Sequence, residues 1–492
     1  MSQNDDQMNV AFSDFFRVRR KTVERYGAFD ISLVGDLPLF VDPFLLFNSR
    51  KRKYRLLHAQ MIDYLRFLRD KSANQQLDPG LIRAWYVFPE VRQNWLGFSA
   101  SGNHGRGLGP KFAQALHANL GKLFMSFGEE RITKGSHLEK LCLISDGVGR
   151  DNISDFTNNL IRHFLLDYTE KFAQRFIDPS FRRKFRINKV RFNYDTESWE
   201  SNVYDLPCFR GEYIILTPHD ILTKDETWIN KADLVHDFHN IPDAIPDVQL
   251  RAQINNYFKK VLPRRPKAED ERNAKLKTIW EFPELIDYFI KYKEEHGSEA
   301  ERISAARVAF SDFLYLQQFK QLPGLLKQTT DFYKVAGLSY EEAHQRVLFF
   351  KDVIENKGGH RIFYVSAKPI EREADLHILY RMTWFASESD VTREANDGRG
   401  PVDFKISTGA KDKALVEFKL ANNPQLKRNL QNQAEIYQKA SDAKRTIKVI
   451  VFFTAGEKKH VDNVLIQLKL TNSPDVILVD ARRDNKPSGS KA

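Results

Sequence analysis

Two acidic residues and a lysine in the last quarter of the chain have the types and spacing that metal-dependent hydrolysis uses. Asp403 lies in the stretch 402–406, and Glu417 and Lys419 lie in the stretch 415–420. In both stretches apolar and charged residues alternate with the period of two that is typical of β-strands. The segment between them is rich in turn-forming residues. We therefore predict a β-hairpin that directs Asp403, Glu417 and Lys419 into one space.

This trio suits the hydrolysis of phosphodiester bonds. Two carboxylates that lie close together repel each other, and a divalent cation relieves the repulsion. Because these hard oxygens have no His or Cys beside them in the sequence, we expect Mg²⁺ or Mn²⁺ rather than zinc, with the backbone carbonyl of Phe418 as a further ligand. Such a metal activates water and stabilises negative charge, while the lysine orients or deprotonates the water and balances a phosphate. The alternative is an exposed hairpin with ordinary surface charges.

A known family carries the same residues in this order. The triplets Pro401-Val402-Asp403 and Glu417-Phe418-Lys419 resemble the signature of the PD-(D/E)xK nuclease superfamily, whose members share the restriction-endonuclease-like fold. The one departure is Val402, which separates the proline from the aspartate. The resemblance covers residues 369–480, under a quarter of the chain. It implies a mixed sheet flanked by helices and the hydrolysis of nucleic acid with Mg²⁺ or Mn²⁺.

The resemblance also implies site residues on the helices beside the hairpin. In the superfamily an early helix often contributes an acidic residue to the metal site, and Glu373 resembles that residue; Glu371 and Asp375 are the alternatives. Gln433 and Tyr437 resemble the Gln-x-x-x-Tyr element of RecB-like members. That Gln and Tyr are four positions apart, so a helix places them one turn apart.

The pattern of apolar residues predicts the other elements of this C-terminal domain. Strands are expected over 391–394, 447–453 and 476–479, and helices over 370–380 and 461–470. Together with the hairpin they describe an α/β domain.

The chain as a whole reads as a multidomain α/β protein. We expect a mixed α/β N-terminal recognition or assembly domain over 1–262 and a charged linker followed by a helical spacer over 263–368. The nuclease domain follows over 369–480, and residues 481–492 form a polar tail. The main boundary rests on the charged, proline-bracketed segment that begins at Pro263.

Composition favours a nucleic-acid partner. The chain has 492 residues, a formal net charge of +11 and 42% hydrophobic residues, which describes a globular protein with an affinity for polyanions. A basic protein with no anionic partner is the alternative. Only Cys142 and Cys208 occur, which fits a reducing cytoplasm without a disulfide scaffold. We expect no membrane segment and no secretory signal, because the first residues are polar and no apolar run is long enough.

The function expected from these observations is that of a Mg²⁺-dependent nuclease, with DNA favoured over RNA. By analogy of architecture alone, the layout resembles prokaryotic restriction and anti-phage defence nucleases. Two alternatives stay open: a nucleic-acid-binding or structural protein with an inert nuclease-like domain, and a DNA repair or recombination nuclease. Because one site cuts one strand at a time, we expect a homodimer or larger homo-oligomer; a partner protein stays an open alternative.

Three other segments have weaker signals. The basic cluster 50–55 suits either phosphate contact or a solvated helix start. The glycine-rich segment 99–110 suits a connector better than an anion-binding loop. The run 141–145 suggests a buried strand followed by a turn at Asp146, a second possible site.

Overall fold

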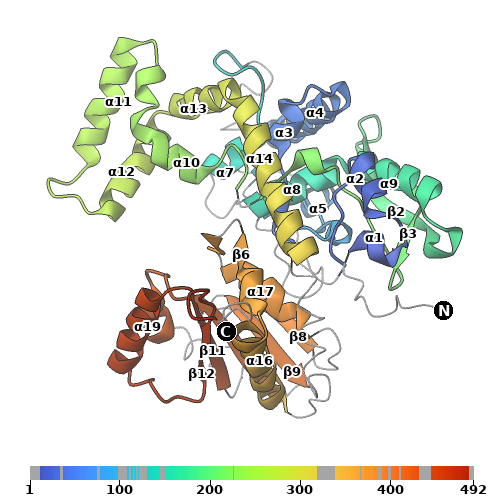
Figure 1. The fold of residues 1–492 in the computed structure, drawn as a ribbon. Coiled ribbons are helices and arrows are strands. Elements are labelled where there is room, and N and C mark those ends of the chain that lie inside the picture. Colours follow the sequence, from blue (N-terminus) through green and yellow to red (C-terminus); the bar gives the residue numbers. More distant parts are fainter. Residues whose placement is uncertain are drawn as a thin grey trace.

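The computed structural model describes residues 11–33, 37–74, 78–97, 108–109, 112–114, 116–117, 120, 130–144, 150–224, 226–318, 338–365, 368–371, 373–384, 390–396, 401–408, 412–431 and 445–486. These residues form a mixed α/β chain, as predicted. Its N-terminal elements, a set of helices and a C-terminal sheet are visible as separate groups in Figure 1.

The C-terminal sheet contains five strands among the described residues, in the order β12-β11-β10-β9-β8. Strands β8, β9 and β10 are antiparallel neighbours, whereas β10, β11 and β12 run parallel. The strands are β8 (Asp390–Asn396), β9 (Pro401–Thr408), β10 (Asp412–Leu420), β11 (Arg445–Phe452) and β12 (Val476–Asp480). The predicted hairpin is therefore confirmed as β9 and β10, and the three other predicted strands are present.

Helices cover both faces of this sheet. On one face, Phe418 of β10 packs against Phe350 of α16 (Ser339–Asn356) and Tyr380 of α17 (Glu373–Met382), with ring centroids 6.1 and 4.9 Å apart. On the other face, Ile450 shares a small core with α19 (Ala455–Gln467) and the helical residues 426–431. Because both faces are covered, β10 is buried from Ala414 to Leu420, charged residues included.

The segment predicted as a helical spacer contains helices that pack in two different places. The helices α12 (Ala268–Glu281), α13 (Glu284–Glu295) and α14 (Gly297–Ser311) follow one another, and in Figure 1 α14 runs toward the C-terminal sheet. Helix α16, by contrast, lies against β10 and β12. Helix α11 (Val248–Val261) packs on α12 across the predicted boundary at residue 262.

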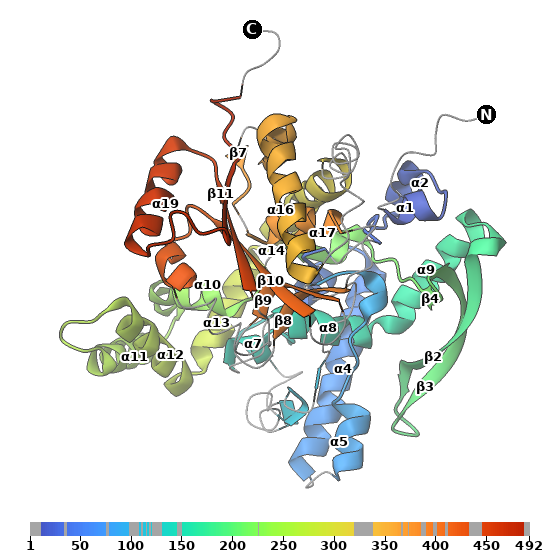
Figure 2. The same ribbon diagram turned by 90° about the horizontal axis from the view of Figure 1, so that it is seen from below.

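The N-terminal part consists of helices around small sheets. Its helices are α1 (Phe12–Phe15), α2 (Arg20–Tyr26), α3 (Pro43–Phe47), α4 (Arg52–Asn74), α5 (Pro79–Trp85), α7 (Lys140–Ile144), α8 (Arg150–Leu160), α9 (Arg162–Phe176) and α10 (Lys231–His236). Its strands are β1 (Leu39–Val41), β2 (Arg182–Asn193), β3 (Ser198–Phe209), β4 (Glu212–Tyr213) and β5 (Leu222–Lys224), and the short strands β6 (Tyr364–Val365) and β7 (Lys368–Pro369) precede α17. Strands β2 and β3 form a long ribbon at the edge of the molecule, away from the C-terminal sheet in both views (Figures 1 and 2).

One secondary-structure prediction in this part is wrong. The run 141–145 was expected to be a strand, but Lys140–Ile144 forms helix α7. Leu138, Leu141 and Cys142 are buried together at helical spacing, and periodicity alone does not separate a short apolar strand from a buried helix. The associated candidate Asp146 lies outside the described residues, as does most of the glycine-rich segment 99–110.

The basic cluster 50–55 is a helix start, one of its two interpretations. Helix α4 begins at Arg52. Lys51 forms an ion pair with Asp220, and Tyr54 Oη donates a 2.8 Å hydrogen bond to the same carboxylate. These contacts attach the start of α4 to the rest of the N-terminal part.

Candidate functional site

Asp403 is positioned by the point at which strands β9 and β10 separate. Their ladder runs from the pair Asp412–Thr408 to the pair Val416–Phe404 and ends there. Beyond that end, the backbone N–H of Phe418 donates a 2.6 Å hydrogen bond to Asp403 Oδ2. The Asp403 carboxylate thus accepts a hydrogen bond from a backbone amide of β10 that lies beyond the last residue paired with β9. This hydrogen bond holds the Asp403 side chain beside β10.

Lys419 lies at the centre of the predicted site. Its Nζ is 3.3 Å from Glu373 Oε2, 3.5 Å from Glu417 Oε1 and 3.7 Å from Asp403 Oδ2. It also donates a 2.9 Å hydrogen bond to the backbone carbonyl of Phe418. The structure therefore brings three carboxylates and one backbone carbonyl from the sequence prediction around the ammonium group of Lys419.

Among the three acidic residues considered on the preceding helix, Glu373 is the one that reaches this group. It lies in the first turn of α17, and its Oε1 accepts hydrogen bonds from Leu420 N at 3.3 Å and Asn423 Nδ2 at 2.8 Å. Glu371 is exposed and precedes the helix. Asp375 is buried elsewhere, where it accepts a hydrogen bond from Tyr315 Oη.

His377 is a site residue that the sequence analysis did not identify. Its Nε2 lies 3.1 Å from Asp403 Oδ2, and its ring packs edge-on against Phe404 with centroids 5.6 Å apart. The signal was available, because His377 follows Glu373 by four residues and such a spacing places both on one side of a helix. A lone histidine on a helix with an apolar face does not by itself indicate contact with an aspartate on a distant strand.

Burial and crowding shift the pKa values of the grouped residues in different directions. Burial and the charge of Asp403 raise the pKa of Glu417 to about 7. Burial also acts to raise the pKa of Asp403, but His377, Lys419 and the Phe418 amide outweigh it and lower that pKa to about 2. The pKa of Lys419 is raised, because the three carboxylates outweigh its burial. The lysine is held in its charged form.

The donor set fits a hard divalent cation by type. Three carboxylates and the Phe418 carbonyl are oxygen ligands of the kind that Mg²⁺ and Mn²⁺ prefer, although the structure places His377 Nε2 3.1 Å from Asp403, where the sequence predicted no histidine. Burial is the main cause of the raised pKa of Glu417 and the charge of Asp403 is the second, and a cation relieves that charge repulsion. In the arrangement described, the Lys419 ammonium lies among these carboxylates. Within the described residues, no three His, Cys, Asp or Glu side chains are already gathered as a metal cluster. Metal binding therefore requires the carboxylates to turn from the ammonium toward a shared ion.

The two remaining predicted residues, Gln433 and Tyr437, lie outside the described residues. The helical residues 426–431 lead toward them, with Leu426 and Leu430 buried against the sheet. Their predicted role stays a prediction.

Two family models match parts of the chain. Residues 17–230 match a domain of unknown function, DUF8370, and residues 339–455 match another, DUF8371. The second match runs from the start of α16 into α19 and contains every described residue of the candidate site. No curated protein and no solved structure matches the chain. Within the part of the chain that the structure describes, no helix has the length and apolar character needed to cross a membrane.

Proposed function

We propose that this chain is a metal-dependent nuclease and that Asp403, Glu417, Lys419 and Glu373 form its active site. The observation that carries the proposal is the convergence of three carboxylates, from α17, β9 and β10, on the Lys419 ammonium, each within 3.7 Å. The hairpin motif singles out three of the four residues from the sequence.

Burial argues against a hairpin with ordinary surface charges. Glu417 and Lys419 are each only 6% exposed, whereas surface carboxylates and lysines are normally solvated. Taking charges out of water costs several kcal/mol for each ion and is a poor route to stability. Buried, mutually perturbed ionisable groups are typical of functional sites, which favours a chemical role for this group.

The architecture around the site also supports the proposal. The PD-(D/E)xK resemblance implies a mixed sheet with helices on its faces, and the sheet that carries the site has both parallel and antiparallel strands. Helices α16 and α17 cover one face and α19 covers the other. The metal-site acid that the resemblance assigns to an early helix corresponds to Glu373 in the first turn of α17.

Each residue has a role that follows from its position. Asp403, Glu417, Glu373 and the Phe418 carbonyl would hold Mg²⁺ or Mn²⁺, which lowers the pKa of a bound water and offsets charge on a phosphate. The Phe418 amide orients Asp403 through the 2.6 Å hydrogen bond. Lys419, kept charged by the carboxylates, suits the stabilisation of negative charge on the scissile phosphate better than it suits removal of a proton.

The proposal is tested by incubating the purified full-length protein with supercoiled plasmid, linear duplex DNA, single-stranded DNA and RNA. Each substrate is tried with Mg²⁺, with Mn²⁺ and with excess chelator. We expect cleavage that requires metal and that is lost in Asp403→Asn, a variant that keeps an oxygen for the Phe418 amide but removes the charge. Asp462→Asn is the matched control, because Asp462 is a half-exposed carboxylate on α19 that pairs with Lys458 and lies outside the candidate site.

Two results would overturn the proposal. One is equal cleavage by Asp403→Asn and the wild type. The other is binding of nucleic acid without cleavage under every metal condition, which would favour the alternative of an inert nuclease-like domain.

A further inference from the structure

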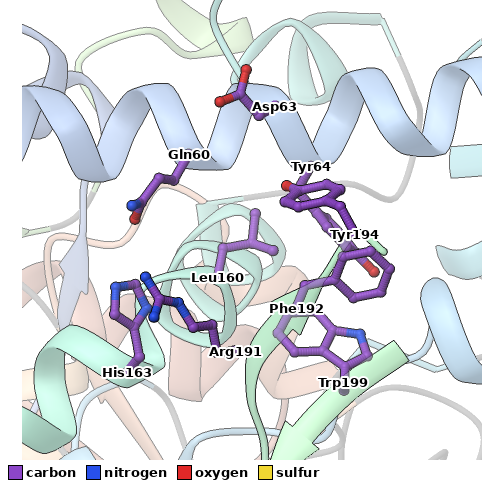
Figure 3. A pocket seen from close by; sticks show the side chains of 9 residues that line it. All are labelled: Gln60, Asp63, Tyr64, Leu160, His163, Arg191, Phe192, Tyr194 and Trp199. Carbon is purple, nitrogen blue, oxygen red and sulfur yellow. The ribbon is translucent and has the colours of Figure 1, made fainter. Parts of the chain in front are cut away.

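A second candidate site lies on the N-terminal part of the chain. A pocket with a volume of about 220 Å³ is enclosed by α4, the ends of α8 and α9, and the β2–β3 ribbon (Figure 3). None of the residues that line it belongs to the proposed nuclease site. In Figures 1 and 2 the ribbon and the C-terminal sheet lie well apart.

One side of the pocket is an aromatic cluster. Phe192 lies 4.9 Å from Tyr64, 5.1 Å from Tyr194 and 5.3 Å from Trp199, measured between ring centroids. These edge-on contacts hold the rings in place. Tyr194 is 48% exposed at the rim, and an exposed aromatic ring on a rigid wall offers a surface on which a planar ligand can stack.

The other side of the pocket carries the cation Arg191, while the carboxylate of Asp63, on the α4 wall, lies 3.2 Å from Arg66. The side chains of Arg191 and His163 lie beside each other there (Figure 3). Among the described residues Arg191 is exposed and makes no ion pair. Burial and the nearby Arg191 lower the pKa of His163, so the imidazole is a neutral hydrogen-bonding group beside a permanent cation. This pairing suits a phosphate.

The backbone that presents Arg191 is anchored. Strand β2 contains a register shift between Ile187 and Arg191, and Lys189 within it has a φ of 53°. The Lys189 ammonium donates hydrogen bonds to the carbonyls of Ala84 and Val87, at 3.0 and 3.1 Å. Irregularities of this kind redirect a side chain from the regular strand face, and here the anchor holds the segment that carries Arg191.

The charge around the pocket favours an anionic ligand. Strand β2 has the sequence RRKFRINKVRFN, with six Lys or Arg residues among twelve and no Asp or Glu. A concentration of positive charge along one strand attracts polyanions and nucleotides. The pocket therefore combines a stacking surface, a phosphate partner and a favourable potential.

We propose that this pocket binds one nucleotide unit, with its base stacked on Tyr194 and its phosphate held by Arg191. A volume of about 220 Å³ lies below the range of roughly 300–1,000 Å³ of pockets for drug-sized ligands, which limits the occupant to a single unit. That chemistry is shared by a free mononucleotide and by one nucleotide of a single strand. The inference does not depend on the proposed nuclease activity, because the two sites have no residue in common.

Titration of the full-length protein in chelator tests the proposal without cleavage. The probes are the 5′-monophosphates of adenosine, guanosine, cytidine and uridine, a six-nucleotide single-stranded DNA, and inorganic phosphate, and binding is followed by calorimetry. We expect Arg191→Gln and Tyr194→Ala each to weaken binding about tenfold, because each removes one of the two main contacts. The matched control is Arg183→Gln, which removes an exposed arginine from the same strand away from the pocket.

The outcomes separate the two sources of the ligand. If a mononucleotide binds and its binding depends on Arg191 and Tyr194, the ligand of the pocket is a free nucleotide. If only the hexanucleotide binds, with the same dependence on both residues, the ligand is one nucleotide of a single strand. The proposal fails if no probe binds at millimolar concentration. It also fails if Arg183→Gln weakens binding as much as Arg191→Gln, since binding would then reflect only the overall charge of the ribbon. A circular dichroism spectrum of each variant checks that its fold is intact.

Discussion

Replacing Lys419 by methionine removes the cation around which the candidate active site is arranged. The side chain keeps its length and apolar stem, but three carboxylates lose an ammonium that lies 3.3, 3.5 and 3.7 Å from their oxygens. All four groups are largely buried. The substitution therefore perturbs both the chemistry and the stability of the site.

The expected magnitudes differ for these two properties. Removing one preorganised group that stabilises transition-state charge typically lowers turnover about 10²- to 10³-fold, and we expect at least this loss of cleavage. Removing one partner of a buried ionic group costs roughly 3–5 kcal/mol, because the remaining charges stay buried without compensation. Proton uptake by Glu417, whose pKa is already raised to about 7, reduces that cost.

The assay compares Lys419→Met with Lys413→Met in plasmid cleavage and in thermal unfolding. Lys413 lies on the same strand but at the far end of the hairpin, paired with Ser407, so it controls for loss of a lysine from β10. The readout is the shift of the thermal transition of each variant relative to the wild type under identical conditions. Added Mg²⁺ should raise the melting temperature of Lys419→Met more than that of the wild type, since a bound cation then replaces the missing charge.

Near-wild-type turnover by Lys419→Met would refute the assigned role of the lysine. A lack of any Mg²⁺ effect on the melting temperature of either protein would contradict the metal site itself. The second readout does not depend on having found the right substrate.

Three further predictions concern other parts of the chain. Burial raises the pKa of Asp30 to about 6, although Ser13 donates two hydrogen bonds to it. The folded state therefore binds this proton more tightly than the unfolded state. The free energy of unfolding should fall by up to roughly 3 kcal/mol as the pH rises from about 4 to about 6. Thermal unfolding across that range should lose this pH dependence in Asp30→Asn, and an unchanged profile would show that Asp30 is not its source. Asp375 accepts a hydrogen bond from Tyr315 and lies 3.8 Å from Lys224 Nζ, so it links α17 to the N-terminal part. Asp375→Asn should lower the cleavage rate about tenfold and leave nucleic-acid binding, measured by fluorescence anisotropy, unchanged. Full activity of this variant would show that the link does not position α17. Because paired sites are needed to cut both strands together, light scattering should give twice the chain mass of 57.3 kDa, whereas the monomer mass would contradict the expected dimer.

Local patterning was sufficient to predict the two strands that carry most of the candidate site. Alternating residues in 402–406 and 415–420 predicted the two strands of the hairpin, and the structure confirms them as β9 and β10. The same reasoning failed for the run 141–145, because its described residues, 141–144, are helical. An apolar run of four or five residues fits both the helical period of 3.6 and the strand period of two, and only the surrounding structure decides which of them forms.

Packing decided how the predicted helices are used. Helix α16 was expected to belong to a spacer, yet it covers the sheet beside the candidate site, where Phe350 contacts Phe418. An amphipathic helix shows that it has an apolar face but not which surface that face meets. Glu417 and Lys419 are buried because helices pack on both faces of the sheet. That packing depends on the whole domain and not on the residues next to them in the sequence.

Residue spacing alone shows which residue types stand at strand spacing and which acids share a helix. Glu373 and Asp375 are two residues apart, so the helical period of 3.6 places them on nearly opposite sides of α17. The spacing therefore shows that these two acids face different surroundings, but it does not show which of them faces the hairpin. Tertiary structure made that choice, because the orientation of α17 is set by the packing of Tyr380 on Phe404 and Phe418, residues that lie more than twenty positions away. That packing directs Glu373 to Lys419, Asp375 to Tyr315 and His377 to Asp403.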